Sequence, residues 1–173
     1  MTRQIQVIDD LAYIPLNDGV CAIIDADDLP KVASFTWHVS KECATSYARS
    51  HIRLPNGNRK KIRMHRLLMD NPYGVEVDHV NSNGLDNRKS NLRLATHEQN
   101  MRNASMRKDN SSGVKGVSWS EATKRWIAAI RVGGPKKYLG SFKELSDAAQ
   151  AYAEASKKFH GEFGRVALNG DIK

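Results

Sequence analysis

Residues 75–100 constrain the fold of this chain more than any other part of the sequence. Residues 75–79 alternate apolar and polar side chains, which is typical of a strand, and a loop rich in Asn, Ser, Gly and Asp follows. Residues 91–95 predict a second strand. Thr96 and Gln99 then have the spacing of a capping box, which begins a helix. The segment therefore predicts two strands and a helix in succession.

Polar side chains of this segment have the chemistry that phosphodiester hydrolysis requires. A hard divalent cation such as Mg²⁺ binds carboxylate and amide oxygens and keeps several waters, which suits Asp78 and Asn100 as ligands. A neutral imidazole accepts a proton from water near neutral pH, which suits His79 as a base. Because neighbouring residues in a regular strand point to opposite faces, we expect Asp78 and His79 at the strand end, where the loop begins.

Residues 64–100 resemble the HNH (His-Asn-His) endonucleases, also called ββα-metal nucleases, in their phage- and intron-encoded branch. Five short elements occur in the same order: His65-Arg66-Leu67, Asp78-His79, Asp86-Asn87-Arg88, Asn91-Leu92-Arg93 and Gln99-Asn100. Asn and Asp also form turns in ordinary hairpins, but five elements in order favour the nuclease.

The resemblance implies a role for each named position. His79 is expected to be the general base, and Asp78 and Asn100 to be ligands of one Mg²⁺, for which Mn²⁺ can substitute. Asn91 is expected to be the catalytic-site residue that ties the loop and so orients His79. The third position is Asn100 rather than a histidine, which favours magnesium over zinc, and no zinc is expected. His97 is the alternative ligand.

The matched helix and loop also carry basic side chains. We expect Arg63, His65, Arg66 and Arg88 to contact DNA, and the resemblance also implies structural hydrogen bonds in the loop 86–88. Six basic residues and no acidic one lie from residue 53 to 66, and the formal net charge of the chain is +8. A basic run is often only a solvated face, but here it accompanies a metal-type motif and favours a nucleic acid partner.

Residues 1–62 predict short antiparallel strands. Apolar and polar residues alternate in short bursts at 13–16, 20–24, 35–39 and 47–49, and turn-forming residues separate them. Residues 54–59 predict the tip of a hairpin. A short helix is expected from residue 27 onward. Cys21 and Cys43 have no C-x-x-C spacing, so we expect two small buried side chains rather than a zinc ribbon or a disulfide.

Residues 113–168 predict a separate module. Strands are expected at 113–119, 125–131 and 136–142, followed by a helix that begins near Ser146 and ends before Gly161. The motifs Gly-Val, Trp-x-Ala-x-Ile-Arg, Leu-Gly-x-Phe and Ala-Ala-x-Ala-Tyr occur in this order. In these motifs the segment resembles the ethylene-response-factor (Apetala-type) DNA-binding domain. That resemblance implies a three-stranded sheet that lies in the major groove of DNA.

Alternation sorts the faces of this predicted sheet. Trp126, Ala128 and Ile130 should face the helix, and Ile127, Ala129 and Arg131 the DNA. The resulting candidate contacts with DNA are Lys115, Trp119, Arg131, Lys136 and Tyr138, although Trp119 and Tyr138 are equally compatible with core packing. Ser118, Ser120 and Ala129 depart from the plant pattern, so base readout cannot be transferred. We expect the module to position the enzyme more than to select a sequence.

The fold predicted overall is α+β. Residues 1–101 are expected to form the N-terminal strands and the nuclease element (motif 64–101), 102–112 a basic linker, and 113–173 the DNA-binding module. No apolar run approaches the roughly 20 residues that span a bilayer. The protein is expected to be cytoplasmic, within a bacterial host if a phage encodes it, without a small-molecule cofactor, and a monomer or weak dimer.

The function favoured by these features is a magnesium-dependent DNA endonuclease of the phage or homing type, which nicks duplex DNA as a monomer. One alternative is a DNA-binding regulator that no longer cleaves and keeps a vestigial nuclease fold. Another is an RNA-processing nuclease, which is disfavoured because a sheet shaped for a wide major groove suits B-form DNA better than A-form RNA.

Overall fold

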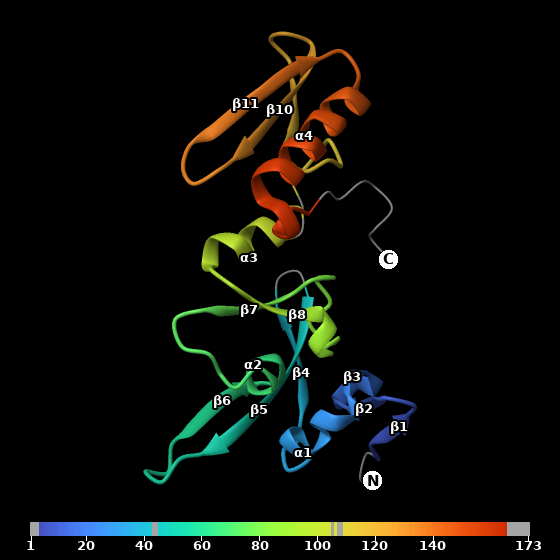
Figure 1. Cartoon of the computed structure of the whole chain (residues 1–173), viewed down its shortest axis with the longest axis vertical. Coiled ribbons are helices and arrows are strands. Elements are labelled where there is room, and N and C mark those ends of the chain that lie inside the picture. Colours follow the sequence, from blue (N-terminus) through green and yellow to red (C-terminus); the bar gives the residue numbers. More distant parts are fainter. Residues whose placement is uncertain (1–3, 43–44, 105, 107–108, 166–173) are drawn as a thin grey trace. The chain divides into compact units, whose positions relative to one another are not determined.

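The computed structural model describes residues 4–42, 45–104, 106 and 109–165. The chain divides into two compact units, Met1–His97 and Glu98–Lys173 (Figure 1). Small antiparallel sheets and a few helices give each unit the α+β character that the sequence predicts. Within the described residues, no helix is both long enough and apolar enough to cross a membrane.

The first unit contains three small antiparallel sheets in its described part, with strand orders β1-β2-β3, β4-β5-β6 and β7-β8. The strands are β1 (Gln6–Ile8), β2 (Leu11–Pro15), β3 (Cys21–Asp25), β4 (His38–Glu42), β5 (Thr45–Arg53), β6 (Arg59–Arg63), β7 (Glu76–His79) and β8 (Leu92–Ala95). The helices are α1 (Leu29–Val32) and α2 (Met64–Leu68), with the short 3-10 turns Asn17–Gly19, Ala26–Asp28 and Lys89–Asn91.

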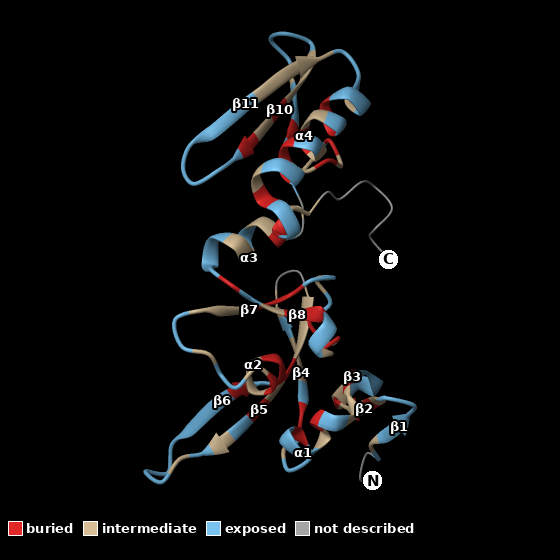
Figure 2. Ribbon diagram, viewed as in Figure 1, coloured by how far each residue is buried: buried red, intermediate tan, exposed pale blue. Residues whose placement is uncertain are grey.

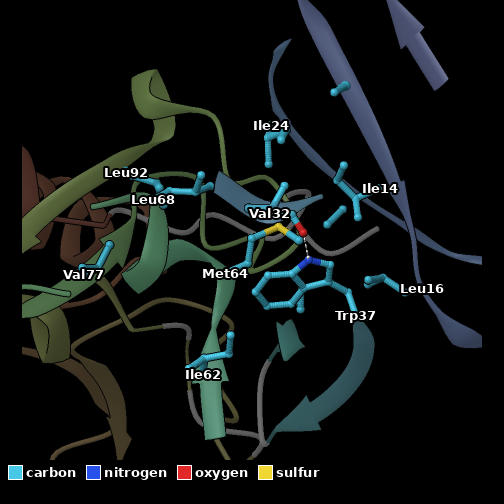
Figure 3. Packing of buried hydrophobic residues seen from close by; sticks show 13 residues of the cluster. Ile14, Leu16, Ile24, Val32, Trp37, Ile62, Met64, Leu68, Val77 and Leu92 are labelled. Carbon is cyan, nitrogen blue, oxygen red and sulfur yellow. Dashed lines mark hydrogen bonds between the residues drawn. The ribbon is translucent and has the colours of Figure 1, made fainter. Parts of the chain in front are cut away.

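One hydrophobic core joins the three sheets. Alternate residues of β2 and β3 point inward and meet both short helices and the inner faces of β6, β7 and β8. Figure 3 shows this cluster, which includes Ile14, Ile24, Val32, Ile62, Met64, Leu68, Val77 and Leu92. The buried Trp37 donates its indole N–H to the Val32 carbonyl at 2.9 Å, so its one polar group is satisfied.

Two expectations for this region are wrong. The strand predicted at 35–39 begins only at His38, because Phe35 and Trp37 turn into the core and contact each other edge to face at 5.7 Å. Cys21 is exposed rather than buried, since it begins β3 on the side that faces away from Ala22. Cys43 lies outside the described residues.

The second unit starts with α3 (His97–Asn103), of which all but the first residue belongs to it. A sheet of order β11-β10-β9 follows, built from β9 (Val117–Ser120), β10 (Arg125–Arg131) and β11 (Lys136–Phe142). α4 (Leu145–His160) packs on one face and ends at Gly161, where the sequence predicts its end, before the 3-10 turn Gly161–Phe163. Three strands and one helix are therefore arranged as predicted.

Small residues let α4 approach its sheet closely. The core of this unit consists of Val114, Val117, Ala128, Ile130, Ala148, Ala149, Tyr152 and Ala155. Gly116 has φ +74°, and a Cβ at this position would lie 2.1 Å from the ring of Tyr152. Only glycine fits at this point, for both its conformation and the close contact.

Candidate active site

The β7–β8 hairpin carries the residues with which the sequence argument began. Asp78 and His79 are the last two residues of β7, the strand end at which they were expected. Asp78 lies opposite Arg93 and His79 opposite Leu92. Both side chains are buried, with 5% and 4% of their surface exposed. Buried polar groups need partners, so the surroundings of each side chain define the chemistry of the site.

Arg93 is the partner of Asp78. The guanidinium donates from Nε and Nη2 to Asp78 Oδ2 at 2.9 and 2.8 Å, and both side chains are largely buried. Two charges this deep in a protein are tolerated only as a pair. The sequence argument did not single out Arg93, although a hairpin closed at this register would have placed it opposite the carboxylate.

Asn87 is a hydrogen-bond partner of the His79 ring, with Oδ1 3.3 Å from Nε2. Asn87 is fully buried, and its backbone N–H donates to the Ile23 carbonyl at 2.7 Å. Burial lowers the pKa of His79, and the hydrogen bond to Asn87 and the charges of Asp78 and Asp86 only partly offset this. The ring is therefore neutral at neutral pH, the state that a general base requires.

Three rings meet at the site. The His79 ring lies 4.9 Å from that of His65 and 5.7 Å from that of Tyr47, and the latter two are 5.3 Å apart. These side chains come from β7, α2 and β5, so elements distant in sequence enclose the imidazole. The loop after β7 also packs here, since a Cβ on Gly84 would lie 2.6 Å from the Tyr47 ring.

Asn91 ties the loop between the two strands. Its Nδ2 donates to Asn81 Oδ1 at 2.9 Å and to the Asp86 carbonyl at 2.7 Å, and its Oδ1 accepts from the Asn81 backbone N–H at 2.9 Å. Asp86 accepts two hydrogen bonds from Arg88, at 2.7 Å each, which lower the pKa of Asp86. This network matches the loop-tying position that the resemblance implies for Asn91.

The comparisons with known proteins agree with this hairpin. Residues 65–102 match the family described as HNH endonuclease. An uncharacterised HNH endonuclease of Acanthamoeba polyphaga mimivirus is 30% identical over 166 residues, which cover 91% of this chain and 81% of that protein. The chain belongs to the HNH endonuclease family.

A shorter match covers part of this HNH endonuclease. Protein 3.8 of Escherichia phage T7 is 34% identical over 94 residues, which cover 54% of this chain and 77% of that protein. No solved structure matches the chain. The relatives therefore support the family, and the roles of individual residues rest on the geometry of this chain.

In the first unit, three side chains that were expected to contact DNA are buried or bonded within the protein. His65 is 3% exposed, and burial lowers its pKa to about 3, so it is a neutral core ring rather than a phosphate ligand. Arg66 donates to the carbonyls of Val75 and Pro72 and holds the segment before β7. The guanidinium of Arg88 is engaged by Asp86, as described above.

Arg63 fits its expected role better. Its side chain is 44% exposed, its guanidinium carbon lies 5.5 Å from the centre of the Tyr47 ring, and it forms an ion pair with Glu42 at 3.1 Å. Tyr47 in turn contacts His79. Arg63 is therefore an exposed cation that contacts the Tyr47 ring, which in turn contacts the candidate base His79.

The ligands of the expected metal are only partly described. Asn100 is the fourth residue of α3, as predicted, and belongs to the second unit, so its convergence with Asp78 stays a prediction. The alternative ligand His97 pairs through Nδ1 with Glu76 at 2.8 Å. Within the described ranges, no group of three or more His, Cys, Asp or Glu side chains is arranged so that it could hold a metal ion. A carboxylate and an amide oxygen nevertheless suit Mg²⁺, which needs few protein ligands.

The outer face of the second unit's sheet carries three of the expected contacts. Arg131 pairs with Lys136 across β10 and β11, and Ala129 pairs with Tyr138, so these side chains share a face. Arg131 and Lys136 are exposed, and Tyr138 is 60% exposed. The alternation predicted for β10 is confirmed, because Ala128 and Ile130 are buried against α4.

The other two expected contacts lie elsewhere. Trp119 is opposite Trp126, with the two rings 5.0 Å apart, and so lies on the α4 side of the sheet. Lys115 donates from Nζ to the carbonyls of Arg102 and Ala104 at 2.6 and 2.7 Å, and burial lowers its pKa to about 8. Lys115 thus satisfies orphan carbonyls at the end of α3, which removes it from the outer face.

Proposed function

We propose that this HNH endonuclease is a metal-dependent enzyme of the phage or homing type that hydrolyses phosphodiester bonds in duplex DNA. It nicks one strand per active site and works as a monomer or weak dimer in the cytoplasm of a bacterial host. The observation that carries the proposal is a neutral imidazole, His79, next to a carboxylate, Asp78, at the end of the family's hairpin. The similarity to a phage protein supports the proposed phage-type enzyme in a bacterial host.

His79 acts as the general base. With the Nε2 proton donated to Asn87 Oδ1, the ring lone pair is on Nδ1, which takes the proton from the attacking water. The amide of Asn91 holds the loop on which Asn87 lies, and thereby fixes the ring orientation. The rings of Tyr47 and His65 pack around the imidazole, and 4% of the His79 surface is exposed.

Asp78 and Asn100 would hold a Mg²⁺ ion. Such an ion, once bound, supplies positive charge that stabilises the phosphate and the departing oxygen. Arg93 fixes the rotamer of Asp78 in the absence of the ion, because two of its N–H groups bind one carboxylate oxygen. The carboxylate is therefore held in place before the substrate arrives.

A nicking assay tests the proposal. Supercoiled plasmid is incubated with the protein in Mg²⁺, Mn²⁺ or EDTA, and the products are run on native and denaturing gels to separate single-strand from double-strand cuts. Loss of the base in His79→Ala should reduce the rate about 10²- to 10⁴-fold. Asn83→Ala is the matched control, since it removes an exposed polar side chain from the loop that follows β7. Equal cutting by wild type and His79→Ala would show that His79 is not the base.

A second function has one observation in its favour. The Asp78 carboxylate is already neutralised by Arg93, as expected for a DNA-binding regulator that kept the nuclease fold without its metal. Such a protein would bind duplex DNA and leave it intact in both Mg²⁺ and Mn²⁺. The same plasmid assay, combined with a binding measurement, separates the two functions.

The second unit is proposed to be a DNA-binding module of the ethylene-response-factor type. Its three-stranded sheet on one helix has the expected architecture, and Arg131, Lys136 and Tyr138 share the face away from α4. A sheet face with two cations and an exposed aromatic ring suits phosphate contacts and groove packing. The module would increase the affinity of the enzyme for duplex DNA and would position it along the duplex.

A further inference from the structure

The β5–β6 hairpin concentrates its basic side chains on one face. Side chains alternate along a strand, and directly paired residues point to the same side. The registered pairs Arg49–Arg63, His51–Lys61 and Arg53–Arg59 therefore all lie on a single face. Most of β6 is exposed in Figure 2.

The opposite face of the hairpin is held by the core. Ala48, Ser50 and Ile62 are buried, and Ile52 packs against the same cluster. Ser50 also donates its hydroxyl to the Thr36 carbonyl at 2.7 Å. The orientation of the hairpin is thus fixed, and the basic face is held toward solvent.

This arrangement is unfavourable unless something anionic binds. Like charges directly opposite each other on an antiparallel pair repel. In the described part of the chain, Arg53, Arg59 and Lys61 have no acidic side chain within ion-pair distance, and the one carboxylate near the face, Glu42, is shared by Arg49 and Arg63. A row of phosphates would relieve the repulsion.

The basic face leads directly to the candidate base. Tyr47 lies on the same face of β5 as Arg49 and Arg53, because the three are separated by even numbers of residues along the strand. The centre of its ring is 5.7 Å from that of the His79 ring. At about 3.4 Å per residue, the six residue steps from Tyr47 to Arg53 span roughly 20 Å. That length corresponds to about six base-pair steps of B-form DNA.

We propose that this face of the β5–β6 hairpin, defined by Arg49, His51, Arg53, Arg59, Lys61 and Arg63, binds the backbone of the duplex on one side of the cleavage point. The proposal rests on the proposed function, since it places DNA at His79. A two-stranded ribbon fits the roughly 12 Å major groove of B-form DNA, whereas the major groove of A-form RNA is deep and narrow.

Neighbouring lysines on β6 provide a matched pair of variants. Lys61 points to the basic face, and Lys60, also exposed, pairs with Ile52 on the other face. Lys61→Glu and Lys60→Glu therefore make the same change of charge one residue apart. Thermal unfolding of both variants confirms that each is folded before binding is compared.

Binding of the full-length protein to a fluorescently labelled DNA duplex is measured by anisotropy over a series of salt concentrations, in EDTA so that no cutting occurs. Lys61→Glu should lower the affinity about tenfold or more and reduce the slope of log K against log salt by about 0.9 per lost phosphate contact. Lys60→Glu should bind nearly as the wild type does. Glu42→Gln should bind more tightly than wild type, because it releases Arg49 and Arg63.

The outcomes separate this inference from the proposed function. Equal affinities of Lys61→Glu and Lys60→Glu would overturn the DNA-binding face even if the wild type cuts plasmid. A loss of DNA affinity in Lys61→Glu but not in Lys60→Glu, combined with no cutting by the wild type, would support the DNA-binding face and reject the nuclease activity. Equal competition by an A-form RNA duplex would overturn the choice of DNA.

Discussion

Arg93 lies directly opposite Asp78 in the β7–β8 hairpin, and its guanidinium holds one oxygen of that carboxylate with two hydrogen bonds of 2.9 and 2.8 Å. The expected metal ligand is thus a member of a buried ion pair. The pair orients the carboxylate, and a cation bound by Asp78 as proposed would meet the guanidinium at the same oxygen. Metal binding at Asp78, as proposed, would therefore be coupled through Arg93 to the stability of the unit.

The first prediction concerns this pair. Arg93→Leu leaves the Asp78 charge buried without its partner, which should destabilise the protein by about 3 kcal/mol. The double variant Asp78→Asn/Arg93→Leu should recover much of that loss, because no uncompensated charge remains. Urea unfolding of both variants, and of Asp78→Asn alone, gives the coupling energy. A coupling near zero would mean that the two groups do not interact as the structure indicates.

The second prediction concerns pH. Below pH 6.5 the unfolded chain protonates His65, whereas the folded chain keeps it neutral until about pH 3. Stability should therefore fall as the pH falls from 6.5 toward 3, by about 1.4 kcal/mol per pH unit for this group. The lowered pKa of His79 adds loss in the same direction.

His65→Phe tests the share that belongs to His65, since it retains a ring of similar size without the titrating group. Unfolding free energies measured at several pH values should show a shallower acid slope in this variant, by about one proton. An unchanged slope in His65→Phe would place the acid sensitivity elsewhere.

The third prediction concerns the orientation of the base. Asn87→Ala removes the side chain 3.3 Å from His79 Nε2, so the ring loses its partner and kcat should fall roughly tenfold to a hundredfold while KM changes little. Asn87→Asp keeps an acceptor but adds a negative charge, which should raise the pKa of His79 and move the acid limb of the activity profile to higher pH.

Steady-state nicking rates over a pH series measure both variants of Asn87. The exposed loop residue Asn83 provides the control, as Asn83→Ala removes an amide from the same loop without touching the ring. A shift of the pH profile is the informative result, because a merely structural effect of Asn87 would lower the rate equally at every pH.

The fourth prediction concerns the second unit. Arg131→Ala/Lys136→Ala removes two cations from the outer face of the β10–β11 pair and should weaken DNA binding about tenfold, with a salt slope reduced by up to about 1.8. Lys137→Ala is the control, since Lys137 lies on the other face, where its Nζ is 4.8 Å from the Phe159 ring. Similar affinities for these variants at every salt concentration would exclude the outer face from binding.

Local patterns in the sequence predicted much of the framework. The strand–loop–strand–helix order, the position of Asp78 and His79 at a strand end and the two faces of β10 all follow from alternation and turn chemistry, which depend on near neighbours in the chain. The strand predicted at 35–39 is wrong because Trp37 packs into a core formed by residues distant in sequence, which local patterns do not report.

Tertiary structure decided which charged and polar side chains are available for function. By composition, His65, Arg66, Arg88 and Lys115 are all plausible phosphate ligands, yet each is buried or bonded to a partner within the protein. The same holds for the pairing of Asp78 with Arg93 and for the single basic face of β5–β6. Burial and register are set by contacts between segments far apart in sequence, and they determine whether a charge meets water, a neighbouring group or a bound phosphate.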